Sequence, residues 1–201
     1  MSINSLTLQI PEENNLSWKH IADDAEVYTE RIYEASQDAT YSMPESSVRL
    51  PFDGDEMMEH IKPTYTAVSE KADYCIVVGI GGSSNGTQAV YNALFQSEDP
   101  ETELIFVDTT SPHILQKAKK VIAAAENKEE VVLAVVSKSG TTTETLSNFA
   151  VLFNEMQQKF KAAAEQVVAI TEYASPLWQT AEKNGMHSLA IPENVGGRFS
   201  V

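Results

Sequence analysis

Between residue 74 and residue 191, short and almost uninterrupted runs of Val, Ile and Leu alternate with longer stretches of helical spacing. The runs are Tyr74–Ile80, Leu104–Asp108, Val131–Ser137, Val167–Thr171 and, more weakly, Leu189–Ile191. A continuous apolar run is typical of a strand covered on both faces, and regular alternation with helices is typical of parallel βαβ units. We therefore expect a three-layer, doubly wound α/β domain with a mainly parallel five-stranded sheet.

Two of the intervening stretches carry clear helix signals. Ser111 followed by Pro112 is typical of a helix start, with a capping residue and then proline at the first helical position. Farther along, apolar residues three or four positions apart predict an amphipathic helix that covers the sheet. These residues are Leu146, Phe149, Phe153, Met156 and Phe160.

The first third of the chain has a different pattern. Apolar residues recur at helical spacing from Trp18 to about Ala35, and a second helix is expected from about Asp55 to Ser69. Asp38 to Gly54 contains prolines and glycine, which predicts a connection along the surface. We therefore expect an N-terminal helical segment over residues 1–72, as an appendage to an α/β domain over residues 73–201.

The chain is acidic, with 14 Lys and Arg residues against 29 Asp and Glu residues and a formal net charge of −15. Clustered positive charge is needed to bind a phosphate backbone, so we expect no nucleic-acid partner. No stretch approaches the length of a membrane span, and the N-terminus lacks the pattern of a signal peptide. The single cysteine, Cys75, lies in an apolar run, which favours a buried thiol and a reducing compartment. We expect a cytoplasmic protein with no membrane partner.

A glycine-rich turn, residues 79–87, follows the first predicted strand; we call it the glycine turn. Backbone N–H groups at a helix N-terminus suit an anion, but a tight turn from strand to helix needs the same glycines. Gly79 and Gly81 begin the dinucleotide fingerprint, but Ser84 replaces its third glycine. The Walker pattern also fails, because Thr87 stands where lysine is required. The turn alone leaves both interpretations open.

A denser cluster of polar residues, which we call the hydroxyl loop (residues 137–145), follows the third predicted strand. Its hydroxyl, lysine and glycine residues are Ser137, Lys138, Ser139, Gly140, Thr141, Thr142, Thr143 and Thr145. Neutral donors, free backbone N–H groups and limited positive charge suit a phosphate monoester. A capping box at Thr141 or Thr142 would use one or two hydroxyls and leave the others without a role. We favour a phosphate-binding loop.

Three motifs, in this order, carry a resemblance to a known family. They are Val78-Gly79-Ile80-Gly81-Gly82-Ser83, Ser137-Lys138-Ser139-Gly140-Thr141-Thr142-Thr143-Glu144-Thr145 and Val195-Gly196-Gly197-Arg198-Phe199-Ser200. Together they resemble the glucose-6-phosphate isomerase (phosphoglucose isomerase) family, in its first sugar-isomerase (SIS) domain, over about residues 73–201. The resemblance implies an SIS-like fold and an enzyme of glycolysis and gluconeogenesis that interconverts glucose 6-phosphate and fructose 6-phosphate. It further implies general acid/base proton transfer through a cis-enediolate, with no metal or cofactor.

The resemblance also implies roles for individual residues. Those implied to hold the substrate phosphate, partly through their backbone, are Ser137, Lys138, Ser139, Gly140, Thr141, Thr142 and Thr145. Gly82 and Ser83 would line the sugar side of the pocket. Arg198 matches the arginine that stabilises the enediolate, a role that suits a guanidinium with several donors.

The family takes its proton-transferring glutamate and its ring-opening histidine and lysine from positions beyond residue 201. We therefore expect this chain to be the N-terminal part of such an enzyme, which binds sugar phosphate but has no turnover alone. The resemblance implies a homodimer for the full protein.

Two other classes of protein remain open. A non-catalytic, sugar-phosphate-sensing SIS domain would share the hydroxyl loop without needing Arg198. A nucleotide-binding domain would instead use the glycine turn together with Asp108, at the end of the second predicted strand.

Overall fold

The computed structural model describes residues 18–95 and 100–196 and contains both helices and strands. The α-helices are α1 (Trp18–Gln37), α2 (Gly54–Ser69), α3 (Asn85–Leu94), α4 (Pro112–Ala124), α5 (Thr143–Lys159) and α6 (Pro176–Asn184). The strands are β1 (Tyr74–Val78), β2 (Glu103–Val107), β3 (Val131–Val136), β4 (Val167–Glu172) and β5 (His187–Ile191). Short 3-10 helices, labelled η, are η1 (Ser46–Phe52), η2 (Gly81–Ser83), η3 (Lys128–Glu130) and η4 (Ala163–Gln166).

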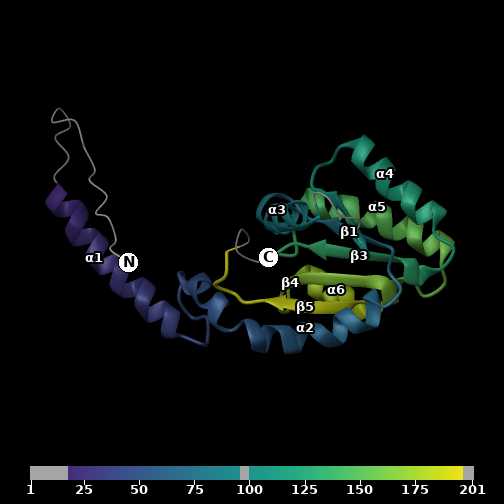
Figure 1. Cartoon of the computed structure of the whole chain (residues 1–201). Helices are drawn as coiled ribbons and strands as arrows, with labels where there is room; N and C mark the ends of the chain where they lie inside the picture. Colours follow the sequence, from purple (N-terminus) through teal and green to yellow (C-terminus); the bar gives the residue numbers. More distant parts are fainter. Residues whose placement is uncertain (1–17, 96–99, 197–201) are drawn as a thin grey trace.

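The strands form one five-stranded sheet in the order β2-β1-β3-β4-β5, and every neighbouring pair is parallel (Figure 1). The predicted α/β fold is therefore confirmed, and each predicted apolar run overlaps a strand. The sheet is entirely parallel across the described residues, where the sequence predicted a mainly parallel one. This strand order is that of flavodoxin-like sheets and differs from the order of the dinucleotide-binding fold.

Alternate residues of the central strands pack against helices on opposite faces of the sheet. Leu133 of β3 belongs to the large core cluster that includes Ile122 of α4, Leu152 of α5 and Leu177 of α6. Val132, its neighbour, packs instead with residues next to or within α2. Burial on both faces explains why β3, whose residues are all buried, has a continuous apolar sequence.

Cys75 of β1 packs against the smaller core cluster beneath α2. Burial raises the pKa of its thiol to about 12, because the apolar surroundings disfavour the thiolate. The raised pKa agrees with the expectation of an unreactive thiol, although the residue is half-buried where the sequence predicted a buried one.

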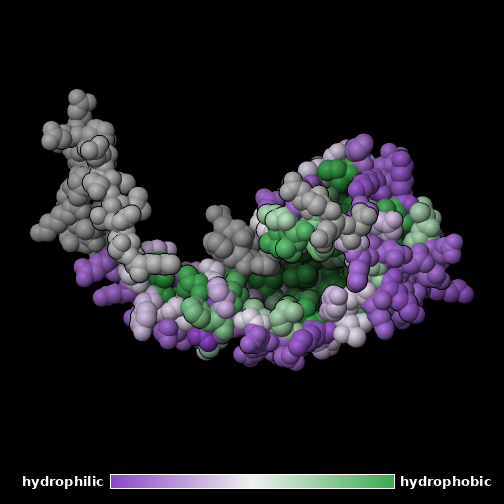
Figure 2. Space-filling model, in the orientation of Figure 1, coloured by the Kyte–Doolittle hydropathy of each residue, from purple (hydrophilic) through white to green (hydrophobic). Residues whose placement is uncertain are grey.

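Apolar side chains also reach the surface on α3. Val90 and Leu94 are both more than half exposed, and Figure 2 shows apolar surface over this helix. No helix within the described ranges is long and apolar enough to cross a membrane.

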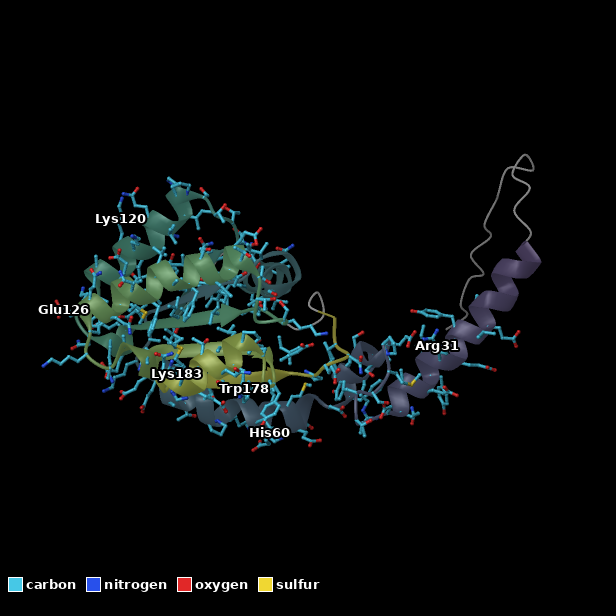
Figure 3. The ribbon with its side chains drawn as sticks, turned by 180° about the vertical axis from the view of Figure 1, so that it is seen from behind. Arg31, His60, Lys120, Glu126, Trp178 and Lys183 are labelled. Carbon is cyan, nitrogen blue, oxygen red and sulfur yellow. The ribbon has the colours of Figure 1, made fainter. Side chains whose placement is uncertain are left out.

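Helix α1 extends away from the sheet (Figures 1 and 3). Arg31 on this helix, labelled in Figure 3, forms an ion pair of 2.7 Å with Glu45. The segment from Asp38 to Gly54, predicted to be a plain surface connection, contains the 3-10 helix η1. Its structure comes from polar contacts between side chains, which an analysis of apolar spacing does not detect.

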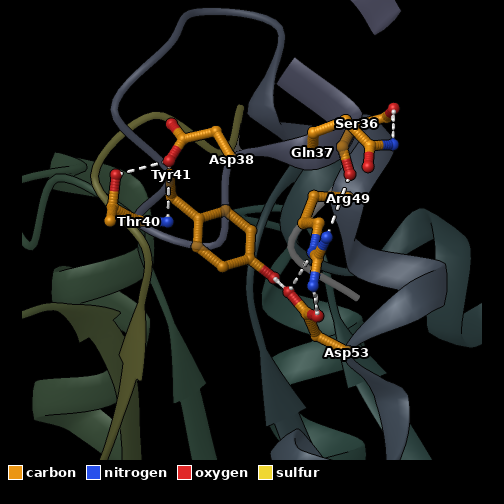
Figure 4. Close-up of polar contacts among 7 residues, drawn as sticks. All are labelled: Ser36, Gln37, Asp38, Thr40, Tyr41, Arg49 and Asp53. Carbon is orange, nitrogen blue, oxygen red and sulfur yellow. Dashed lines mark hydrogen bonds and ion pairs between the residues drawn. The ribbon is translucent and has the colours of Figure 1, made fainter. Parts of the chain in front are cut away.

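These contacts form a network around Tyr41 (Figure 4). The Tyr41 hydroxyl donates to Asp53 Oδ2 at 2.8 Å, and Arg49 Nε donates to both Asp53 carboxylate oxygens at 2.9 Å. Arg49 Nη1 donates to the Ser36 carbonyl oxygen at 3.0 Å. Burial, followed by the contact with Asp53, raises the pKa of Tyr41 to about 12. The network joins the end of α1 to the start of α2.

Candidate functional site

The glycine turn and the hydroxyl loop follow adjacent parallel strands. Because β1 and β3 run side by side in the same direction, the turns at their carboxyl ends lie at one edge of the sheet. The chain leaves β1 for β2 on one side of this pair and leaves β3 for β4 on the other. This is the topological switch point, where open α/β sheets bind their ligands.

Gly79 lets the glycine turn approach β3 closely. A Cβ atom at this position would lie 2.9 Å from the Ser83 carbonyl oxygen and 3.2 Å from the Val136 carbonyl oxygen. No side chain fits there without displacing the backbone. Gly82 and Ser83, which were predicted to line the pocket, belong to η2 and are half-buried.

Gly140 likewise allows a close approach of the backbone in the hydroxyl loop. Its φ of +65° lies in the left-handed region, and its N–H donates to the Ser137 carbonyl oxygen at 3.0 Å. A Cβ atom would lie 2.6 Å from Ser175 Oγ and 2.9 Å from the Leu177 nitrogen. The loop is therefore packed directly against the N-terminus of α6.

The loop hydroxyls are paired with one another. Ser137 Oγ donates to Thr142 Oγ1 at 3.1 Å, and Ser139 Oγ accepts from Thr141 Oγ1 at 3.0 Å. Thr145, one turn along α5, is buried, whereas Ser139 is exposed. The structure thus brings the predicted residues of this loop together at the start of one helix.

Thr142 occupies the N-cap position of α5, but its side chain makes no capping hydrogen bond. The first N–H groups of an α-helix have no partner within the helix. The amides of Thr143, Glu144 and Thr145 are therefore left for an acceptor outside the helix, and the positive end of the helix dipole favours an anion there. The capping box considered from the sequence is not the arrangement adopted.

Lys138 differs from the other loop residues, because its ammonium group turns toward the ends of β4 and β5. Its Nζ lies 3.1 Å from Glu172 Oε1 and donates to the Glu193 carbonyl oxygen at 2.5 Å. Its own carbonyl oxygen accepts from the Glu172 N–H at 2.9 Å and from Thr171 Oγ1 at 3.1 Å. The backbone of Lys138 stays in the hydroxyl loop while its side chain binds elsewhere.

The sequence analysis missed several polar residues that support this edge. Thr171 Oγ1 lies 2.8 Å from Ser175 Oγ, and Ser175 caps α6 by accepting from the Trp178 N–H at 3.1 Å. The Ser84 hydroxyl is buried at the N-cap of α3 and has no partner among the described residues. Ser175 followed by Pro176 repeats the start pattern seen at Ser111 and is the signal that could have identified the cap.

The third motif of the sequence analysis is described only as far as Gly196. Val195 is buried, and its N–H donates to the Pro192 carbonyl oxygen at 3.0 Å. Gly197 and Arg198 lie outside the described residues. Within the described ranges, no group of His, Cys, Asp and Glu residues is arranged to hold a metal ion.

Comparison with known proteins identifies the family. The phosphoglucose isomerase family model matches residues 30–201. The chain belongs to the phosphoglucose isomerase family. The family resemblance of the three sequence motifs is thereby confirmed, and the match also takes in α2 and the Tyr41 network.

Curated relatives and solved structures agree with this family assignment. The glucose-6-phosphate isomerase of Campylobacter jejuni is 36% identical over 126 residues, which are 63% of this chain and 30% of the relative. That of Carboxydothermus hydrogenoformans is 34% identical over 161 residues, which are 75% of this chain and 34% of the relative. The chain therefore spans about a third of the length of these isomerases.

Two crystal structures share the fold. A glucose-6-phosphate isomerase from Chlamydia trachomatis has a TM-score of 0.60 at 28% identity, covering 78% of this chain and 28% of that one. A hypothetical protein from Thermus thermophilus has a TM-score of 0.68 at 23% identity, covering 90% of this chain and 43% of that one. At that identity the second similarity concerns the fold alone.

Proposed function

We propose that this chain is the N-terminal, sugar-phosphate-binding part of a glucose-6-phosphate isomerase. The observation that carries the proposal is the hydroxyl loop at the switch point, with paired hydroxyls in front of an uncapped helix N-terminus. A phosphate dianion accepts hydrogen bonds only, and this loop presents donors without a surrounding field of positive charge. The division into residues 1–72 and 73–201, a cytoplasmic location and a homodimer of the full protein belong to the same proposal.

The phosphate would accept from the hydroxyls of Ser137, Ser139, Thr142 and Thr145 and from backbone N–H groups of the loop. Within each hydrogen-bonded pair, rotation of the hydroxyl groups would turn their protons from each other toward the phosphate, since a hydroxyl hydrogen rotates to suit its partner. Gly82 and Ser83, at the adjacent strand end, would face the sugar.

The chemical step requires a proton to move between C1 and C2 of the open-chain sugar. Arg198, through its guanidinium donors, would stabilise the enediolate that forms between the two proton transfers. The proton-transferring groups are expected beyond residue 201, so this chain alone should bind substrate without turning it over.

Calorimetric titration of the 201-residue chain tests the proposal. We expect saturable binding of glucose 6-phosphate, no binding of glucose, and at least about tenfold weaker binding by the double variant Ser139→Ala/Thr142→Ala, which loses two donors to a charged group. The matched control removes two hydroxyls outside the loop, in the variant Ser147→Ala/Thr180→Ala, and should bind as the unmodified chain does.

Three results would contradict the proposal. Equal binding of glucose would mean that the phosphate is not recognised, and undiminished binding by the double variant would place the site elsewhere. Saturable binding of NAD or a mononucleotide in place of glucose 6-phosphate would favour the nucleotide-binding alternative.

A further inference from the structure

Lys138 lies between two parts of the candidate site. Its backbone belongs to the hydroxyl loop, and its side chain reaches the segment of residues 192–196, which we call the C-terminal segment. This segment leads directly into Gly197 and Arg198 in the sequence. The contact between Lys138 Nζ and the Glu193 carbonyl oxygen joins residues 55 positions apart.

The ammonium group is held in this position from two sides. Glu172 supplies a carboxylate at 3.1 Å, and Glu193 supplies a backbone carbonyl at 2.5 Å. Both are charge-assisted contacts, and the side chains of Lys138 and Glu172 are 27% and 32% exposed, so water screens them only in part. A lysine that bound phosphate directly would need this ammonium group free and directed at the ligand.

The C-terminal segment is also attached on its other side and within itself. Asn194 Nδ2 donates to the Tyr41 carbonyl oxygen at 2.8 Å, and the Val195 N–H closes a turn onto Pro192. The segment is therefore held between the N-terminal network and the hydroxyl loop, and Lys138 makes the contact on the loop side.

We propose that Lys138 is a positioning residue that couples occupancy of the hydroxyl loop to the order of the C-terminal segment. The proposal rests on the proposed function, because it takes the loop to be a phosphate site. A bound phosphate fixes the backbone of Lys138, which restrains the side chain, and the ammonium group then holds the Glu193 carbonyl. Binding at the phosphate end of the substrate thus restrains residues 192–196.

Coupling of this kind is reciprocal and has a measurable size. If phosphate stabilises the segment, loss of the segment contact weakens that stabilisation and leaves the loop donors themselves intact. The diagnostic quantity is therefore the change that phosphate causes at the segment, measured separately from the affinity of the loop for phosphate.

The test uses the 201-residue chain and inorganic phosphate as the probe. Hydrogen exchange is followed by mass spectrometry in the peptide that contains the Val195 amide, with and without phosphate, and phosphate affinity is measured by calorimetry. Lys138→Met removes the ammonium group and keeps most of the aliphatic length. Lys120→Met, on the exposed side of α4 (Figure 3), is the matched control, and Lys138→Arg tests rescue by another charged donor.

We expect phosphate to slow exchange at Val195 by about fivefold or more in the unmodified chain and in Lys120→Met. In Lys138→Met, the slowing at Val195 should disappear, and phosphate affinity should fall by no more than the factor by which phosphate slows exchange in the unmodified chain, since the coupling is reciprocal. Lys138→Arg should recover part of the slowing. Thermal melts of the variants in the absence of phosphate establish that the fold is retained.

Other outcomes overturn the proposal in distinguishable ways. A loss of phosphate affinity in Lys138→Met well beyond the slowing factor of the unmodified chain would make the ammonium group a direct ligand. Unchanged slowing at Val195 would show that the contact transmits nothing. If the unmodified chain binds neither phosphate nor glucose 6-phosphate, the proposed function fails and this coupling fails with it.

Discussion

The side-chain amide of Asn194 donates a hydrogen bond of 2.8 Å to the backbone carbonyl oxygen of Tyr41, which precedes it by 153 residues. Tyr41 has a φ of 55°, a left-handed conformation that costs free energy for a residue other than glycine. Its hydroxyl is held by Asp53 and its carbonyl by Asn194. The strained residue is thus fixed at both ends and connects the N-terminal segment to the α/β domain.

We predict that Asn194→Ala lowers the free energy of unfolding by about 1 kcal/mol, because the half-buried Tyr41 carbonyl loses its partner. The variant should also be cut faster by protease between residues 38 and 53. Asn184→Ala is the control, since the Asn184 amide makes a local, exposed bond to the Thr180 carbonyl oxygen. If urea denaturation gives the same decrease in the free energy of unfolding for both variants, the long-range bond contributes no more stability than the local one.

Gly140→Ala and Gly81→Ala form a matched pair of tests. Both glycines have a positive φ, but a Cβ atom at Gly81 meets open space whereas one at Gly140 meets Ser175 and the Leu177 nitrogen. We predict that Gly81→Ala lowers the free energy of unfolding by about 1 to 2 kcal/mol through backbone strain alone. Gly140→Ala should lower the free energy of unfolding by at least about 3 kcal/mol and also weaken phosphate binding. Similar melting temperatures for the two variants would contradict the packing of the hydroxyl loop against α6.

Asp53 should make stability fall in acid. Hydrogen bonds from Arg49, followed by that from Tyr41, hold the pKa of Asp53 below its ordinary value of 3.8. A carboxyl group with a lowered pKa in the folded state contributes stability above its ordinary pKa and loses it as the pH falls through the folded value. Between pH 7 and pH 3, the urea midpoint should therefore fall less in Asp53→Asn than in the unmodified chain.

The control for this experiment is Glu34→Gln, on the exposed surface of α1. Its pH dependence should match that of the unmodified chain. Identical pH profiles for Asp53→Asn and the unmodified chain would show that the network around Tyr41 does not depend on the Asp53 charge.

Cys75 supplies a reporter for the opposite pH range. Its pKa of about 12, raised by burial, means that the folded protein retains the thiol proton where the unfolded chain has lost it. The free energy of unfolding should therefore decrease as the pH rises above about 9, the ordinary thiol pKa. A thiol reagent at pH 8 should modify the native chain at least about a hundredfold more slowly than the chain in urea. Comparable rates would mean that Cys75 is accessible.

Much of the fold could be predicted from local sequence, because strands buried on both faces need continuous apolar runs. Val131–Val136 is fully buried and lies within the predicted run Val131–Ser137. The strand boundaries differ from the predicted ones by one or two residues, because hydrogen bonding, more than hydropathy, decides where a strand ends. The strand order did not follow from the sequence alone, since it depends on which strands pair across long separations.

In the candidate site, too, local sequence predicts some features, and others depend on long-range strand pairing. The hydroxyls from Ser137 to Thr145 are close in sequence and had to be close in space, so they could be found directly. The partners of Lys138 could not, because Glu172 and Glu193 reach it only through the pairing of β3, β4 and β5. The Tyr41 network was missed for a related reason: its members, including Arg49 and Asp53, lie in a stretch without apolar periodicity.

The position of β1 and β3 at the centre of the sheet has a consequence for synthesis of the protein. As the polypeptide leaves the ribosome, β1 emerges before both of its neighbours, and the Lys138 carbonyl must await the Thr171 and Glu172 donors. Until residue 172 has been translated, the nascent hydroxyl loop has no support from β4. The hydroxyls of the loop are thus synthesised before the strand that holds the loop in its native geometry.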